Sequence, residues 1–248
     1  MDITNNTEAV YLFLFGISIL ASFIDSIAGG GGLLTTPSML LVGINPLTVL
    51  GTNKFQSSFS TFTSSRNYYT NGYLTDIHRN KYFILSFIGS SAGTLMVSRL
   101  SDEILRTLIP ILLITVAVFF IINRQVKTDL SNYIVLLTPL IFLIGFYDGF
   151  FGPGTGSFFV MLFLVFKNQS LLESTATSKL LNFASNFAAF IIFAVQGFVM
   201  WELGLIMAVG GIGGAYLGSK SAIKVGDKLI RPILVIVSIL LSLRVLTS

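Results

Sequence analysis

The sequence predicts an all-α polytopic membrane protein built from two inverted repeats. Three observations predict this: the composition, ten apolar stretches, and a set of motifs that recurs in the second half. The chain has 248 residues, of which 53% are hydrophobic and 10% are charged, and its mean hydropathy is +0.84. Soluble domains carry about 25% charged residues, so too few polar residues are present for a water-exposed surface. The apolar stretches are continuous and do not alternate, which argues against a β-barrel.

The apolar stretches define the expected helices. A bilayer crossing needs about 20 apolar residues, and the second and seventh stretches are shorter than that. Both follow glycine-rich segments, the first break (AGGGG at 28–32) and the second break (GPGTG at 152–156). Interrupted backbone at membrane depth is tolerated only where protein or a water-filled cavity covers it. The stretches lie at 9–24, 33–44, 47–65, 82–98, 104–122, 132–147, 157–166, 172–195, 200–218 and 229–246.

Four motifs recur in the same order, about half the chain apart. Such ordered matches indicate a duplication, with a first repeat at 1–125 and a second at 126–248. We expect the glycine pairs among them to let two helices cross closely. The matches, at offsets of 121–125 residues, are Asp25-x3-Gly29-x-Gly31 with Asp148-x3-Gly152-x-Gly154, GTNKFQSS (51–58) with ATSKLLNF (176–183), Gly89-x3-Gly93 with Gly210-x3-Gly214, and DEILR (102–106) with DKLIR (227–231).

Loop charges predict the orientation. With the N-terminus outside, ten basic residues fall in cytoplasmic loops and three on the outer side, as the positive-inside rule requires. Five segments per repeat then invert the second half, a plan common in secondary transporters. Either all ten segments cross, or each repeat opens with a re-entrant hairpin followed by three crossings; the short segments favour hairpins. The ten are Arg66, Arg79, Lys81, Arg124, Lys127, Lys167, Lys220, Lys224, Lys228 and Arg231, and the three are Arg99, Arg106 and Arg244.

Four charged residues lie inside the apolar segments or at their breaks: Asp25, Lys54, Asp148 and Lys179. A charge at the bilayer centre costs roughly 2.5–3.5 kcal/mol, so these side chains must face one another, a substrate or water. Each lysine lies about eight residues into its segment, about 12 Å deep, and inverted symmetry is expected to bring both to one central level.

These residues predict a site for a small oxyanion. The breaks are expected to expose backbone N–H groups at the start of a half-helix, and the lysines add ammonium donors. The aspartates would neutralise the lysines in the empty site, or one would carry a proton; alternatively, each Asp–Lys pair only locks a hairpin to a helix. The predicted site residues are Asp25, Gly29, Gly31, Asn53, Lys54, Ser57, Asp148, Gly152, Gly154, Thr155, Ser178, Lys179 and Asn182.

The composition also excludes several classes of protein. The chain has no cysteine and a single histidine, His78, in a polar stretch, so disulfides, thiolate ligands, a zinc site and a histidine-based triad are not expected. We expect no metal, no cofactor and no enzyme activity. The N-terminal segment MDITNNTEAV has no basic residue, which predicts that the first apolar segment is retained and is not a signal peptide. The net charge of +4 fits basic loops better than a nucleic-acid partner.

The motifs resemble those of the TauE/SafE family of sulfite-exporter-like membrane proteins, over nearly the whole chain. The resemblance rests on D-x3-GGGG at 25–32 followed by Pro37, GTNK at 51–54, DG-x2-GPGTG at 148–156 and ATSK at 176–179. It implies a bacterial-type inner-membrane permease for small anions, with sulfite and organosulfonates as the best-known cargoes. It also implies about eight transmembrane helices, fewer than the ten stretches.

The leading hypothesis is therefore a secondary transporter for a small sulfur-containing or carboxylate anion, coupled to protons through Asp25 or Asp148. An anion channel with the same site is one alternative. An intramembrane aspartyl protease is another, since two membrane aspartates can activate water and Tyr147 precedes Asp148. The absence of Gly-x-Gly-Asp and the two buried lysines count against the protease. A homo-oligomer is compatible with all of these hypotheses.

Overall fold

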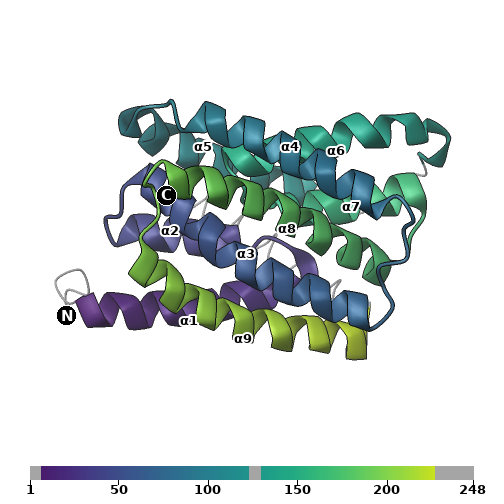
Figure 1. The fold of residues 1–248 in the computed structure, drawn as a ribbon, viewed down its shortest axis with the longest axis horizontal. Coiled ribbons are helices and arrows are strands. Elements are labelled where there is room, and N and C mark those ends of the chain that lie inside the picture. Colours follow the sequence, from purple (N-terminus) through teal and green to yellow (C-terminus); the bar gives the residue numbers. More distant parts are fainter. Residues whose placement is uncertain (1–6, 123–129, 227–248) are drawn as a thin grey trace.

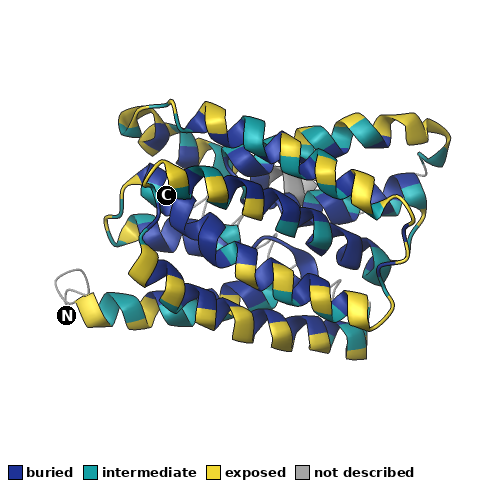
Figure 2. Ribbon diagram, in the orientation of Figure 1, coloured by how far each residue is buried: buried dark blue, intermediate teal, exposed yellow. Residues whose placement is uncertain are grey.

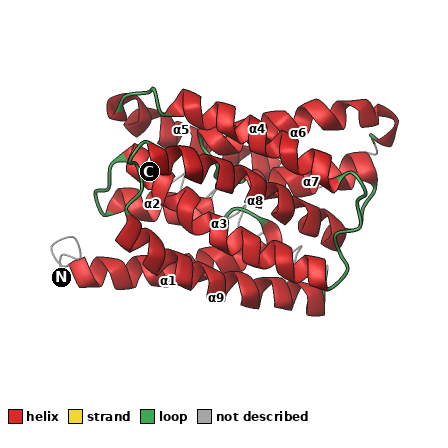
Figure 3. Cartoon of the chain, viewed as in Figure 1, coloured by secondary structure: helices red, strands yellow, loops and turns green. Residues whose placement is uncertain are grey.

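The computed structural model describes residues 7–122 and 130–226, and these ranges form helices joined by short loops, with no strand (Figures 1 and 3). The predicted all-α class is confirmed. The tenth stretch at 229–246 and the DKLIR motif lie outside the described residues. In chain order the helices are α1 (Thr7–Ala28), α2 (Gly32–Leu41), α3 (Pro46–Thr70), α4 (Arg79–Val97), α5 (Asp102–Ile122), the 3-10 helix η2 (Ser131–Leu136), α6 (Leu137–Phe150), α7 (Thr155–Lys167), α8 (Leu171–Val195) and α9 (Trp201–Val225).

The long helices run side by side in layers (Figure 1). Helices α3 and α8 pack against each other in the middle, with α1 and α9 on one side and α4 and α6 on the other. The central helices are mostly buried, whereas the outer faces expose large apolar side chains such as Leu20, Leu143 and Val209 (Figure 2). Extensive exposed apolar surface is typical of a membrane-facing protein.

Four of the described helical segments are long and apolar enough to cross a membrane: Thr7–Ala28, Ser131–Phe150, Leu171–Val195 and Trp201–Val225. Helices α2 and α7 are apolar but have only 10 and 13 residues, as expected for the segments that follow the breaks. Helix α1 has 22 residues and is therefore about 33 Å long. The first arm of the expected hairpin thus has the length of a full crossing.

Both glycine breaks interrupt the helices where the sequence predicts. The first break separates α1 from α2, with φ of +84° at Gly29 and +95° at Gly30. The second break separates α6 from α7, with φ of +99° at Gly152 and +88° at Gly154. Glycine adopts this left-handed region without the steric cost that a Cβ brings. The chain can therefore reverse direction inside the helical bundle (Figure 1).

The recurrent glycine pairs allow the outer helices to touch backbone to backbone. A Cβ added at Gly214 of α9 would overlap the carbonyl oxygen of Ile19 in α1, and one added at Gly93 of α4 would overlap that of Phe146 in α6. Such close approach is the usual role of small residues four apart in membrane helices. The predicted close crossings are confirmed.

Loops contact one another at both ends of the bundle. At one end, Lys167 of α7 forms an ion pair of 3.2 Å with Asp76 in the α3–α4 loop. At the other end, Gln196 after α8 donates to Ser98 after α4 at 3.1 Å. Which end faces the cytoplasm stays a prediction from the positive-inside rule.

Replacing Gly214 by alanine should destabilise the protein, because the new methyl group would overlap backbone that cannot move aside. We expect a loss of about 1–3 kcal/mol, the usual cost of overpacking, measured as a lower Tm in detergent. The matched control is Gly213→Ala, since a Cβ at Gly213 would meet no atom within 4 Å. Equal Tm values for the two variants would contradict the tight crossing.

Candidate functional site

The buried side of α3 is polar, and its hydroxyl groups bond to the helix itself. Ser58 donates to the carbonyl oxygen of Lys54 at 2.7 Å, and Thr61 donates to that of Ser57 at 2.6 Å. A hydroxyl bonded to the preceding turn needs no outside partner. The helix can therefore lie in the middle of the bundle while its ammonium and amide groups remain available for other contacts.

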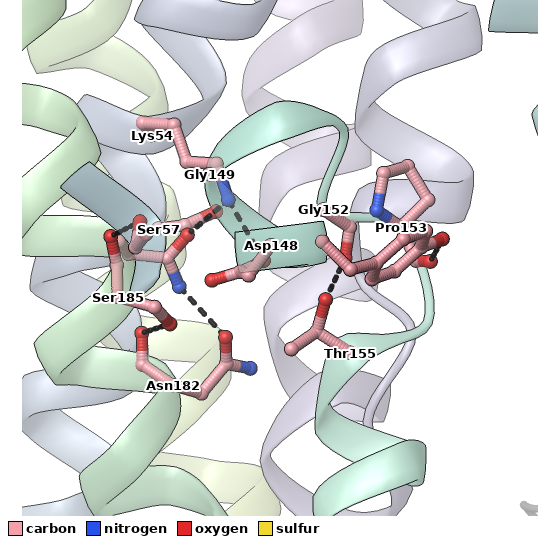
Figure 4. Close-up of polar contacts among 12 residues, drawn as sticks. Lys54, Ser57, Asp148, Gly149, Gly152, Pro153, Thr155, Asn182 and Ser185 are labelled. Carbon is pink, nitrogen blue, oxygen red and sulfur yellow. Dashed lines mark hydrogen bonds and ion pairs between the residues drawn. The ribbon is translucent and has the colours of Figure 1, made fainter. Parts of the chain in front are cut away.

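The first ion pair joins α3 to α6. Lys54 Nζ lies 2.8 Å from Asp148 Oδ1, and both side chains are 2% exposed. Lys54 also donates to Asn186 Oδ1 at 3.1 Å, and Asn186 Nδ2 donates to Asn182 Oδ1 at 3.0 Å. Figure 4 shows Asp148 with Lys54 on one side and Asn182 on the other. The pair thus belongs to a short polar chain across α6, α3 and α8.

The second ion pair joins α8 to the end of α1. Lys179 Nζ lies 2.9 Å from Asp25 Oδ2, with Lys179 fully buried and Asp25 14% exposed. Asp25 Oδ1 accepts a hydrogen bond of 3.1 Å from the N–H of Gly31 in the first break. Both carboxylate oxygens of Asp25 are therefore engaged.

Each aspartate thus pairs with the lysine from the other half of the chain, and the breaks themselves touch. Ser157 Oγ, just after the second break, donates to the carbonyl oxygen of Ala28 at 2.8 Å. A Cβ at Gly29 would overlap the backbone N of Ser157. The two helix interruptions lie against each other inside the bundle.

The two lysines do not share one level, so that expectation is wrong. Lys54 contacts Asn186, which lies seven residues beyond Lys179 on α8. Seven helical residues span about 10 Å. The physical reason is that α1 extends beyond the middle of α3, since Ala28 packs in one cluster with Tyr68 near the end of α3. Asp25 therefore meets Lys179 well past the level of Lys54.

A small polar cavity with an open mouth lies between the breaks and helices α1, α3, α6 and α8. Lys179 does not line the cavity, but it binds Asp25, which does. Ser178 and Gly29 also lie outside it, since Ser178 donates to the carbonyl oxygen of Gly156 at 2.6 Å and Gly29 abuts Ser157. The predicted residues that line the cavity are Asp25, Gly31, Asn53, Lys54, Ser57, Asp148, Gly152, Gly154, Thr155 and Asn182.

Sequence reasoning missed several polar lining residues, namely Ser22, Gln56, Ser60, Thr61 and Asn186. Helical spacing could have found most of them. Residues three or four apart share a face of a helix, so the stripe that starts at Asn53 continues through the polar residues of α3. Asn186 likewise follows Asn182 by one turn. These polar residues recur at helical spacing, and the recurring motif contains only some of them.

The expected cluster of free backbone N–H groups is only partly present. The N–H of Gly31 bonds to Asp25, while those of Thr155 and Ser157 close turns onto Gly152 and Gly154 at 3.1 and 3.0 Å. The glycines therefore serve mainly to turn the chain and to fit against the opposite break. Side chains supply most of the donors that a ligand could use.

Three groups in the cavity have hydrogen-bonding capacity to spare. Within the described residues, Asn182 Nδ2 donates to no protein group, and Ser57 Oγ accepts from Gln56 Nε2 at 2.8 Å, which leaves its own hydrogen free. Asp148 Oδ2 is buried and receives no hydrogen bond from the described part of the chain. No group of three or more His, Cys, Asp or Glu side chains that could hold a metal occurs in residues 7–122 and 130–226.

Most of the chain matches a known protein family and curated relatives. The family model described as sulfite exporter TauE/SafE matches residues 14–245. The chain is 41% identical over 242 residues to the probable membrane transporter protein ORF9 of Sinorhizobium sp., which covers 95% of this chain and 92% of that protein. It is 37% identical to the probable membrane transporter protein YfcA of Escherichia coli K12, over 94% of this chain and 88% of that protein. No solved structure matches the chain.

Removing the Lys54 ammonium should destabilise the protein strongly, because it leaves Asp148 as a buried charge without its partner. We expect Lys54→Met to cost about 3–5 kcal/mol, and Lys54→Met/Asp148→Leu to recover most of it. The control is Lys220→Met, because Lys220 is exposed on α9. Thermal unfolding in detergent measures all three. If Lys54→Met unfolds at the same temperature as the control, the pair does not hold α6 to α3.

Proposed function

Because the chain belongs to the TauE/SafE family of membrane transporters, we propose that it is a secondary transporter that moves sulfite or an organosulfonate through the cavity between the two breaks. The observation that carries this proposal is a buried ammonium, Lys54, lining a cavity together with neutral donors inside a membrane-type helical bundle. Charge-assisted hydrogen bonds from an ammonium are the strong contacts for an oxyanion.

The lining suits a ligand with several oxygens. A sulfite or sulfonate group presents three, and the cavity offers the ammonium of Lys54, the amide nitrogen of Asn182 and the hydroxyl hydrogen of Ser57. These donors come from α3 and α8, the two central helices. A ligand held between them would bridge the two halves of the chain.

We further propose that the halves are inverted repeats whose relative movement alternates access to the site. Helix packing supports this: α1 packs along α9, while α6 packs along α4. At the repeat offset α1 corresponds to α6 and α9 to α4, so the two contacts are equivalent. In this proposal the protein lies in an inner membrane with its N-terminus on the outer side. Transport is coupled to protons through Asp25 or Asp148.

The protease alternative gains no support from the site. Asp25 and Asp148 are each paired with a lysine, whereas an aspartyl protease needs two carboxylates that share a proton. The names of the relatives are those of membrane transporters.

The test is release of labelled sulfite from proteoliposomes loaded with it. Vesicles that contain the wild-type protein should release sulfite faster than sulfite-loaded vesicles without protein. The rate should saturate as the sulfite concentration rises. Asn182→Asp should slow release roughly tenfold or more, equivalent to ~1.4 kcal/mol, because it replaces a donor in the cavity by a negative charge.

Asn71→Asp is the matched control, since Asn71 is exposed in the loop after α3 and should leave the rate unchanged. Anion transport would be refuted if sulfite and methanesulfonate were both released no faster than from loaded vesicles without protein. A rate that rises without saturation would identify a channel in place of a carrier.

A further inference from the structure

We propose that the cavity takes up one monoanion, of the sulfonate type, together with one proton, and that Asp148 alone holds that proton on Oδ2. This inference rests on the proposed function and deepens it, because it states the charge of the bound anion and assigns different roles to the two aspartates. It follows from the charges in the cavity and from the hydrogen bonds of the two carboxylates.

The charges of the protein's own side chains at the site cancel. Lys54 is paired with Asp148 at 2.8 Å and Lys179 with Asp25 at 2.9 Å, so the site holds two positive and two negative charges. Adding an anion alone would leave a net negative charge in the bundle interior. Transfer of an uncompensated charge into such an environment is strongly unfavourable. A proton that enters with a monoanion keeps the site neutral.

The two carboxylates differ in their capacity to accept that proton. Both oxygens of Asp25 are occupied, one by the N–H of Gly31 and the other by Lys179. Asp148 uses only Oδ1, for Lys54, and its Oδ2 is buried without a hydrogen-bond donor from the described residues. A buried acceptor with no donor is costly, and a proton on Oδ2 makes that oxygen a donor whose acceptor would be an oxygen of the bound anion.

No other charged group in the described structure competes with Lys54 at Asp148. On α8, Lys179 is paired with Asp25. The charged residues of α4 and α7 contact other groups: Arg79 donates to the carbonyl oxygen of Leu74, Lys81 reaches Thr138, and Lys167 pairs with Asp76. Asp25 faces the same cavity from α1. The protonation of Asp148 is therefore linked to Lys54 and to whatever anion the cavity holds.

Binding of the proton and binding of the anion are coupled through Lys54. A proton from water adds to Asp148 Oδ2 and makes the carboxyl neutral, while Lys54 keeps its charge. The sulfonate oxygens then take the place of Asp148 as the partner of the Lys54 ammonium. When the anion leaves, the proton returns to water and the ion pair between Lys54 and Asp148 forms again. Lys179 and Asp25 stay paired throughout.

The test uses methanesulfonate, because its sulfonate group takes up no proton near neutral pH, so any proton that moves is carried by the protein. Proteoliposomes contain a pH-sensitive dye, and potassium with valinomycin sets the membrane potential. Inward flux of labelled methanesulfonate should acidify the interior by one proton per anion. An inwardly directed proton gradient should drive accumulation roughly tenfold per pH unit, whereas the membrane potential should not change the rate.

Asp148→Asn should abolish both the acidification and the gradient-driven accumulation, and any flux that remains should be independent of pH. Asp25→Asn is the matched comparison, and its remaining flux should keep the pH dependence of the wild type. Because the wild-type measurements need no variant, poor folding of either variant leaves the proposal testable.

The outcomes separate the two proposals. Wild-type flux of methanesulfonate that depends on membrane potential, or that moves no proton, would overturn the inference and leave anion transport standing. Flux of sulfite without flux of methanesulfonate would do the same. Flux of neither anion would overturn the proposed function itself.

Discussion

The structure depends on two crossed ion pairs between its halves. Asp25 precedes the first break and binds Lys179 of α8, while Asp148 precedes the second break and binds Lys54 of α3. Four charges inside an apolar bundle would oppose insertion into a bilayer, so each must find a partner. The partners come from the opposite half, and neither half alone could therefore bury its own charges. Folding of the two halves is coupled for electrostatic reasons.

The same pairs explain why the cavity lies where it does. Each aspartate binds a lysine from the other half of the chain and so holds the neighbouring break against a central helix, α3 or α8. The glycines of the breaks have no side chains, which leaves space beside them. The polar faces of α3 and α8 border this space. The hydroxyl groups of α3 bond to carbonyl oxygens of the same helix. The helix can therefore be buried without side-chain contacts across the cavity that would close it.

The sequence allowed the helix positions, both breaks and the close glycine crossings to be predicted, because hydropathy and local backbone preferences determine them. The four buried charges could also be singled out, since their cost in a membrane is independent of the fold. The depth of the lysines could not be predicted correctly, because it depends on how far α1 extends beside α3. Nor could spacing alone show that Lys179 would be enclosed behind Asp25 while Lys54 lines the cavity.

The hydrogen bond from Ser157 to Ala28 bears on whether ions can leak through the protein. Because the two chain reversals lean on each other, a displacement of one would carry the other in the same direction. Under the proposed alternating access, this coupled movement would open one side of the cavity only while it closes the other, so that no continuous aqueous path would form.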